Sequence, residues 1–317
     1  MEKIKKAPSH LTTTMLAIVC CILWGSAMPV LKICYREMKI AGDNIGENLT
    51  LIGMRFLLAG FLLFIVALAV KAPLFKLTPK DIRAIIILGL CSTTLQYFFF
   101  NIGLANTPGV KAIVIEQTSI FFSIILAHFI YTDDKVNVQK STGLLLGLMG
   151  LIIVNINKEA GNIFEFKVMG EGFMLMAGLN AAVAMIIAKK IGSTLPTLVM
   201  TTWQMLIGAA FLFVVGLGMG GKPSALEFNP LTTGLFFYTA VLSAAAFGLW
   251  YYILQYRKVG DLSIYKFIIP VSGSIMSAMF VPEEPILFVH VIGLILVSIG
   301  IVVVNRKNKV KEVLTKA

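Results

Sequence analysis

Hydrophobic residues are grouped in blocks about twenty residues long, and these blocks limit the possible folds more than any other feature of the sequence. A helical block of this length crosses a hydrocarbon layer about 30 Å thick, because an α-helix rises about 1.5 Å per residue. Of the 317 residues, 58% are hydrophobic and 14% are charged, whereas a soluble domain carries roughly a quarter charged residues. The sequence therefore predicts a polytopic integral membrane protein.

Ten such spans are predicted. The unbroken apolar runs favour helices, because the strands of a membrane barrel would alternate apolar and polar residues. The connections are short, so no soluble domain is expected between the spans. The predicted fold class is all-α, and the spans cover residues 11–31, 49–70, 85–105, 110–131, 141–155, 171–190, 197–217, 234–256, 259–281 and 286–305.

The basic residues indicate the orientation of the chain. With ten spans both termini lie on one side, and most Lys and Arg residues outside the spans fall on that side, in the tails and in the loops after even-numbered spans. Basic loops stay in the cytoplasm, so we expect a multi-pass protein of the cytoplasmic (inner) membrane with both termini cytoplasmic. This distribution explains the net charge of +11, and no nucleic-acid partner is expected. The first apolar run is too long for a cleavable signal peptide and is expected to be retained.

The fifth and tenth spans end in similar segments, "GLLLGLMGLIIVN" at 143–155 and "GLILVSIGIVVVN" at 293–305. Weaker matches in the rest of each half pair residues 107–123 with 258–274, the acidic turn "YTDD" (131–134) with "VPEE" (281–284), and Arg55 with Gln204. Each half has five spans, and because five is odd the second half must enter the membrane from the opposite side. Inverted repeats of this kind are typical of secondary transporters, which bind their substrate near the midplane where the halves meet.

Several segments carry a resemblance to a known family: "ILWGSAMPVLK" (22–32), "MRFLLAGFLL" (54–63), "NIGLANTPGVKA" (101–112), the acidic turns after spans four and nine, and the paired closing segments. In their order and spacing they resemble the drug/metabolite transporter superfamily, specifically its ten-helix EamA-type transporters. The resemblance implies an inner-membrane carrier, often an exporter of amino acids or related metabolites. Pro270 in span nine has Ser119 as its counterpart in span four, where such proteins usually have proline.

The chain is accordingly divided into five parts. They are a cytoplasmic N-terminal tail (1–10), a first EamA-like repeat with spans one to five (11–155), an external linker (156–170), a second EamA-like repeat with spans six to ten (171–305), and a basic cytoplasmic tail (306–317).

Three charged residues lie inside predicted spans, where a charge costs at least about 2.5–3.5 kcal/mol on insertion scales: Arg55, Glu116 and Lys266. In one interpretation Arg55 and Glu116, which are expected at similar depth, form a structural ion pair or share a polar network. In the other, Glu116 binds a cationic group or a proton, because a low-dielectric site favours the protonated form of a carboxylate, and Lys266 binds an anionic group. The backbones of Glu116 and Lys266 are expected on the order of 13 Å apart along the membrane normal. Lys266 therefore acts in a different step or faces cytoplasmic water, or else the substrate is longer than a plain amino acid.

Uncharged side chains complete the predicted substrate-binding set. Pockets for small molecules are mainly apolar and aromatic with a few aimed polar groups, and an aromatic face can hold an ammonium group. The residues expected to join Glu116 and Lys266 are Gln96, Tyr97, Asn180, Trp24, Trp250 and Tyr252. The alternative is that the aromatic residues face lipid or anchor the span ends. Candidate hinges, where glycine or proline weakens a helix, are Gly25, Pro29, Pro270 and Gly273.

A secondary transporter is the leading function class, and export of an amino-acid-like or related metabolite by alternating access is expected. No Walker-type phosphate loop is present, which argues against ATP-driven transport by this chain. The alternative is a membrane-embedded enzyme acting on a lipid or isoprenoid substrate. No catalytic residue, cofactor or metal is expected, since the His and Cys residues lack ligand spacing. The expected partners are a small-molecule substrate, the lipid bilayer and protons as a candidate coupling ion, in a monomer or homodimer.

Overall fold

The computed structural model describes residues 8–107, 109–155, 166–280 and 288–305, and every regular element in these ranges is a helix. Most of the two predicted tails and of the linker, and the "VPEE" turn, lie outside the described residues. The boundaries of these parts stay predictions.

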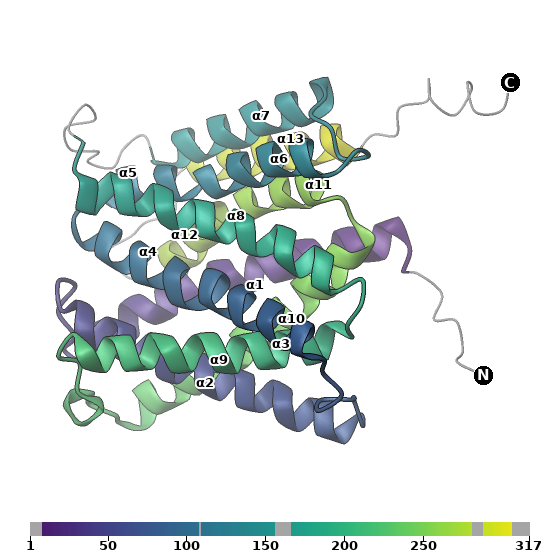
Figure 1. Cartoon of the computed structure of the whole chain (residues 1–317). Helices are drawn as coiled ribbons and strands as arrows, with labels where there is room; N and C mark the ends of the chain where they lie inside the picture. Colours follow the sequence, from purple (N-terminus) through teal and green to yellow (C-terminus); the bar gives the residue numbers. More distant parts are fainter. Residues whose placement is uncertain (1–7, 108, 156–165, 281–287, 306–317) are drawn as a thin grey trace, which may run out of the picture.

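Ten helical segments of membrane length follow one another along the described ranges and lie side by side in one bundle (Figure 1). All but one are long and apolar enough to cross a membrane, and the shorter one is the fifth, as its sequence suggests. The predicted ten-helix membrane architecture is confirmed. The spans are α1 (His10–Glu37), α2 (Ile45–Ala69), α3 with α4 (Pro79–Gly89, Gln96–Ala105), α5 with α6 (Gly109–Glu116, Thr118–Ile130), α7 (Val138–Asn155), α8 (Phe173–Ile191), α9 (Thr197–Gly218), α10 (Pro230–Tyr256), α11 with α12 (Val259–Ser263, Ile268–Phe280) and α13 (Phe288–Asn305).

Spans four and nine are interrupted at corresponding points. Between α11 and α12 the chain forms a 3₁₀ turn over Ile264–Phe267, next to Pro270, whose missing N–H leaves the carbonyl of Lys266 without its helical partner. Between α5 and α6 the helix is interrupted at Gln117, whose N–H donates to the Val114 carbonyl at 3.2 Å. The interruption of span four therefore occurs without a proline.

Span one, in contrast, is one continuous helix that contains Pro29 in its interior. Gly25 lies where α1 crosses α12: a Cβ added there would come within 3.0 Å of the backbone nitrogen of Gly273. Two of the predicted hinge residues, Gly25 of span one and Gly273 of span nine, therefore meet at one close helix crossing. Whether they act as hinges stays a prediction.

The two halves are related by antiparallel pairing of equivalent spans. α7 packs along α13, with Gly143 against Gly300 and Gly150 against Gly293. Gly143 corresponds to Gly293 and Gly150 to Gly300 in the repeat. A two-fold rotation that exchanges the halves therefore converts one contact into the other. Only glycine fits there, since a Cβ on Gly150 would lie 2.8 Å from the Gly293 carbonyl oxygen.

The same relation holds in the rest of the bundle. α2 packs along α9, the equivalent span of the other half, while α1 packs on α12 and α10. The counterpart of α1 is α8, and it packs on α6 and α4, the counterparts of α12 and α10. The predicted inverted repeat is thus present in the packing of the helices.

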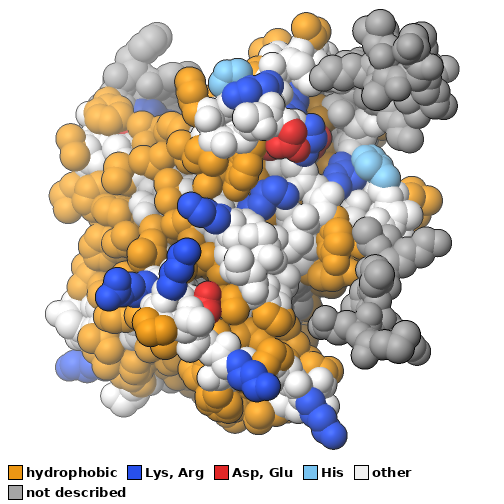
Figure 2. Space-filling view, turned by 45° about the vertical axis from the view of Figure 1, so that its right-hand side comes forward, with side chains coloured by type: hydrophobic (Ala, Val, Ile, Leu, Met, Phe, Trp, Pro, Cys, Tyr) orange, Lys and Arg blue, Asp and Glu red, His pale blue; other side chains and the backbone are white. Residues whose placement is uncertain are grey.

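The start of α1 and the end of α13 lie at one end of the bundle, called the terminal end below. Arg257 contacts both, with hydrogen bonds to the His10 carbonyl at 3.5 Å and to the Asn305 side chain. Figure 2, with this end turned forward, shows Lys and Arg side chains over it and hydrophobic side chains over the flank that would face lipid.

We expect the glycine contact between α7 and α13 to be sensitive to a single methyl group. Gly150→Ala forces a Cβ onto the Gly293 carbonyl and should lower the free energy of unfolding by about 1–3 kcal/mol, the usual cost of overpacking. Thermal unfolding of the purified protein in detergent measures this. Gly234→Ala in α10 is the matched control, because nothing lies within 4 Å of its added Cβ. Equal melting temperatures for the two variants would contradict the prediction.

Candidate functional site

A cavity of about 230 Å³ lies between the two halves. Its wall comes from α1, α2, α4, the interrupted spans four and nine, α8 and α10, whereas α7, α9 and α13 contribute no side chain to it. Pockets for drug-sized ligands measure about 300–1,000 Å³. The size of this cavity therefore suits a small metabolite.

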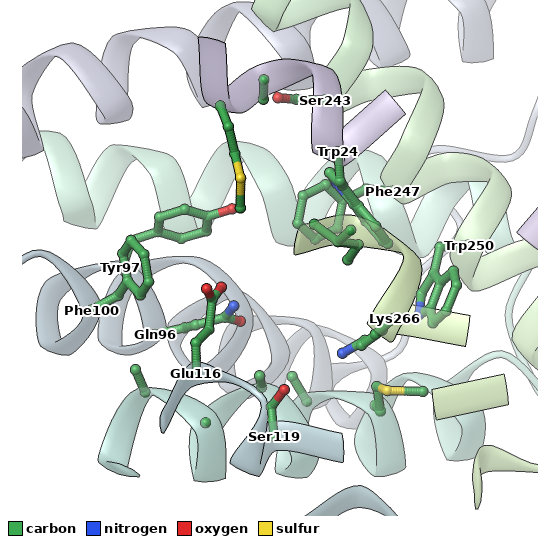
Figure 3. Close-up of a pocket in the computed structure, with 18 of the residues that line it drawn as sticks. Trp24, Gln96, Tyr97, Phe100, Glu116, Ser119, Ser243, Phe247, Trp250 and Lys266 are labelled. Atoms are coloured by element: carbon green, nitrogen blue, oxygen red, sulfur yellow. The ribbon is translucent and has the colours of Figure 1, made fainter. Parts of the chain in front are cut away.

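Glu116 and Lys266 enter the cavity from the two interrupted spans (Figure 3). Glu116 is the last residue of α5, and Lys266 lies in the 3₁₀ turn before α12. Neither forms an ion pair with any described residue, yet each feels the other's charge across the cavity. The long side chains thus face a common space despite the separation expected for their backbones.

Aromatic rings form one wall beside Lys266. The ammonium group lies 5.8 Å from the ring centroid of Trp250, within the range of a cation–π contact. Trp24 packs edge-on against Trp250 at 5.2 Å and against Phe247 at 5.3 Å. This wall can hold the apolar part of a ligand between its charged groups.

Gln96 and Tyr97 also line the cavity, at the start of α4. They directly follow a π-helical turn over Leu90–Leu95, an irregularity that is frequent at functional sites. The Gln96 side chain lies beside the Glu116 carboxylate in Figure 3. Tyr97 packs against Phe56 at 4.7 Å between ring centroids.

Arg55, on α2, lies in the cavity wall and is 5% exposed. Its guanidinium lies 4.4 Å from the ring centroid of Phe56 and next to Tyr97. The ion pairs of the described residues do not include one between Arg55 and Glu116. The structure therefore gives no contact for a structural ion pair of these two residues. A polar network that they share through Tyr97, which lies near both, stays a prediction.

Two predicted site residues lie away from this cavity. The Asn180 amide donates to the Met176 carbonyl of its own helix at 2.8 Å. Tyr252 is 39% exposed and packs against Tyr256, one helical turn further on. Neither belongs to the cavity wall. The structure thus brings together Glu116, Lys266, Gln96, Tyr97, Trp24, Trp250 and Arg55, and separates Asn180 and Tyr252 from them.

Several cavity residues were not predicted as binding residues, among them Met28, Phe100, Ser119, Ser243 and Phe247. These are apolar or small residues within apolar helices, so their type gives no signal. Ser119 could have been found only from its helical spacing to Glu116, three residues before it.

On the side of the cavity toward the terminal end, contacts between the two halves close the bundle. Asp134, after α6, is 2% exposed; it accepts a hydrogen bond from the Gly260 N–H at 2.9 Å and pairs with Lys140. Lys140 also contacts Asp261 at 3.2 Å. Tyr131 donates to the Ile186 carbonyl at 3.4 Å, and burial raises the pKa of its hydroxyl, which keeps it a donor. We call these contacts, together with those of Arg257, the terminal clamp.

Arg257 forms the second part of the clamp, where α10 meets α1 and α13. It is 8% exposed and donates to Thr13 at 3.3 Å, to Thr14 at 3.2 Å and to Asn305. A buried charge with several partners holds helices together, because separating the helices would leave the charge without its hydrogen-bond acceptors.

The described residues contain no group of three or more His, Cys, Asp or Glu side chains that could hold a metal ion. The four cysteines are free thiols, and Cys20 and Cys21 are buried on α1.

Comparison with known proteins agrees with this architecture. The sequence model of the EamA-like transporter family matches residues 11–156 and 168–306, so the chain belongs to this family of membrane transporters. The uncharacterized transporter YvbV of Bacillus subtilis strain 168 is 26% identical over 312 residues, which cover 97% of this chain and 96% of YvbV. A chloroplastic WAT1-related protein of Arabidopsis thaliana is 25% identical, over 89% of this chain and 66% of that protein. One solved crystal structure has the same fold, with a TM-score of 0.76 over 94% of this chain and 97% of that one, at 17% identity.

We expect the terminal clamp to control access to the cavity from the terminal end. Cys21 is fully buried near Lys266, above the clamp. In a background with Cys20→Ser, Cys34→Ser and Cys91→Ser, the substitution Asp134→Asn should raise the rate of Cys21 labelling by an impermeant maleimide about tenfold. Removing one charge of a buried ion pair costs about 3–5 kcal/mol. The loss is smaller here because Lys140 keeps its contact with Asp261.

The neighbouring Asp133→Asn is the control for this labelling, since the Asp133 side chain is 71% exposed and its distance to Lys258 is 3.8 Å. Its rate should match that of the parent protein. If Asp134→Asn labelled no faster than Asp133→Asn, the clamp would not be what closes this end.

Proposed function

We propose that this chain is a secondary transporter that moves a small amino-acid-like zwitterion across the cytoplasmic membrane by alternating access, in the direction of export. Glu116 binds the ammonium group of the substrate and Lys266 binds its carboxylate. Trp24, Trp250, Gln96 and Tyr97 hold the remainder of the molecule. The coupling ion is the proton, taken up by Glu116 when the substrate has left.

The observation that carries this proposal is the pair formed by Glu116 and Lys266. The two side chains bear opposite charges, line one cavity and do not contact each other. A zwitterion between them would compensate both charges at once, which a neutral or singly charged molecule would not. Their place at the breaks of two equivalent spans also favours transport, because discontinuous helices at the midplane form the binding sites of many secondary transporters.

We further propose that both termini face the cytoplasm, so that the cavity of this conformation opens away from it. Support comes from the basic residues at the terminal end and from the clamp that closes this end. The maleimide labelling of Cys21 tests the orientation, since the Asp134→Asn variant should label in inside-out vesicles and not in right-side-out vesicles.

A transport experiment can compare predicted residues that line the cavity with predicted residues that lie outside it. In proteoliposomes loaded with unlabelled amino acids, counterflow of labelled amino acids should be saturable. Gln96→Ala and Tyr97→Phe should lower the rate at limiting substrate about tenfold, the effect of losing one buried hydrogen-bonding group. Asn180→Ala and Tyr252→Phe should keep the wild-type rate, because these side chains lie outside the cavity wall. Equal losses in both pairs would show that transport does not use this cavity.

Glu116→Gln should lower exchange at neutral pH and abolish its pH dependence. In the wild-type protein exchange should fall as the medium becomes more acid, because protonation removes the negative charge that binds the ammonium group. The measurement is the counterflow rate across a pH series, with Glu227→Gln as the control; Glu227 is exposed and pairs with Lys39 at 3.0 Å outside the cavity. An unchanged pH profile in Glu116→Gln would leave Glu116 a structural residue and remove it from the proposed cycle.

A further inference from the structure

Arg55 is a buried cation in the cavity wall that the protein does not neutralise. It is 5% exposed, and its Nε has no hydrogen-bond partner among the residues that the structure describes. The Phe56 ring centroid lies 4.4 Å from the guanidinium carbon. A guanidinium carries five N–H donors in one plane, and a buried charge without a counter-charge is costly. Among the described residues, the guanidinium of Arg55 therefore has no anionic partner, and the cavity offers it space for one.

Other buried cations in the described ranges are compensated by the protein itself. Lys140 contacts Asp134 and Asp261, and Arg257 donates to Asn305 and to two threonines of α1. These two cations lie in the terminal clamp, where a structural role is evident. Arg55 is equally buried, but among the described residues no carboxylate forms an ion pair with it, and its hydrogen-bonding neighbour is the neutral Tyr97 hydroxyl. This sets it apart from the two cations of the clamp.

Arg55 and Lys266 lie at opposite ends of a row of aromatic rings. The row runs from Lys266 over Trp250, Trp24, Phe247 and Phe56 to Arg55, with successive separations of 5.8, 5.2, 5.3, 5.9 and 4.4 Å. Arg55 lies near Tyr97, Tyr35 and Cys34, and Glu116 lies near both Lys266 and Tyr97. The cavity wall thus carries two cations and one carboxylate. When Glu116 binds the ammonium group of a ligand and Lys266 binds one carboxylate, Arg55 needs a second anion.

Building on the proposed function, we propose that Arg55 is a second anion subsite and that the substrate is an acidic amino-acid-like zwitterion, with two anionic groups and one ammonium group. Lys266 binds the carboxylate next to the ammonium group, Glu116 binds the ammonium group, and Arg55 binds the distal anion. The two cations and one carboxylate of the cavity then match the two anions and one cation of the ligand.

This arrangement predicts selection by charge at the distal end of the substrate. Arginine binds a carboxylate through two parallel hydrogen bonds, which are stronger than those to a neutral amide. The affinity for an acid should therefore be at least about tenfold higher than the affinity for the amide of the same shape.

The first test uses the wild-type protein in the counterflow assay. The competitors are glutamate, 2-aminoadipate and 2-aminopimelate, a series in which each member is one methylene longer, and each acid is compared with its side-chain amide. We expect at least one acid of the series to inhibit exchange at a concentration about tenfold lower than its amide. Equal inhibition by acid and amide at all three lengths would overturn the subsite.

The second test uses Arg55→Gln, which places there the residue that occupies the corresponding position on α9, where Gln204 is fully buried. This variant should weaken inhibition by the preferred acid about tenfold or more and leave inhibition by the amide within about twofold. Arg55→Lys keeps the charge and should restore most of the selectivity. Loss of acid and amide binding to the same extent in Arg55→Gln, with Arg55→Lys no better, would make Arg55 a structural residue.

The outcomes separate this inference from the proposed function. Saturable exchange of neutral amino acids without preference for acids would retain the transporter and remove the anion subsite. Absence of exchange with every zwitterion of the series, together with no thermal stabilisation of the purified protein by them, would overturn both. A preference for the acid that disappears in Arg55→Gln supports the subsite.

Discussion

The contact between the closing helices of the two halves fixes the frame on which the rest of the structure depends. Gly143 meets Gly300 and Gly150 meets Gly293, so that two copies of one glycine pattern interlock antiparallel. Within a membrane the helices gain no hydrophobic energy from meeting each other, and close backbone approach at small residues supplies the packing instead. α7 and α13 line no part of the cavity. In the proposed alternating-access cycle, these two helices would stay together while the spans that surround the cavity change their arrangement.

Symmetry of the scaffold is combined with asymmetry of the site. In the repeat alignment Glu116 corresponds to Phe267, Lys266 to Ile115 and Arg55 to Gln204. The backbone breaks near both Glu116 and Lys266, so each half delivers one side chain to the cavity, but the two side chains have opposite charges. In the proposed transport cycle, the symmetric scaffold would allow two similar packings of nearly equal energy. Recognition of a ligand with distinct ends follows from the residues that break the symmetry.

The fold could be predicted from sequence because span length and the count of spans in each half are expressed directly in the apolar blocks. Arg55, Glu116 and Lys266 could be singled out from the sequence because charges stand out in apolar surroundings, and all three line the cavity; their roles stay predictions. Asn180 and Tyr252 were placed wrongly relative to the cavity because α8 and α10 are apolar on all sides, so their sequences do not indicate which face turns inward. Phe247 was missed for the same reason. The depth argument separated Glu116 from Lys266 by counting backbone rise, which takes no account of interrupted helices and long side chains.

A buried charge needs a partner, and the terminal clamp and the cavity meet this requirement in different ways. In the terminal clamp, buried charges such as Asp134 have their partners built in, and this holds the two halves together without a ligand. In the cavity the charges lack such partners among the described residues, and water must compensate them while the cavity is open. The cavity wall carries two cations, Arg55 and Lys266, and one acid, Glu116, so that closure of the empty cavity could pair Glu116 with one of the cations but not with both. Closure around an unpaired guanidinium would be costly, whereas closure around a bound anion would not. A carrier built in this way would change its open side more readily when loaded than when empty, which favours exchange over leakage.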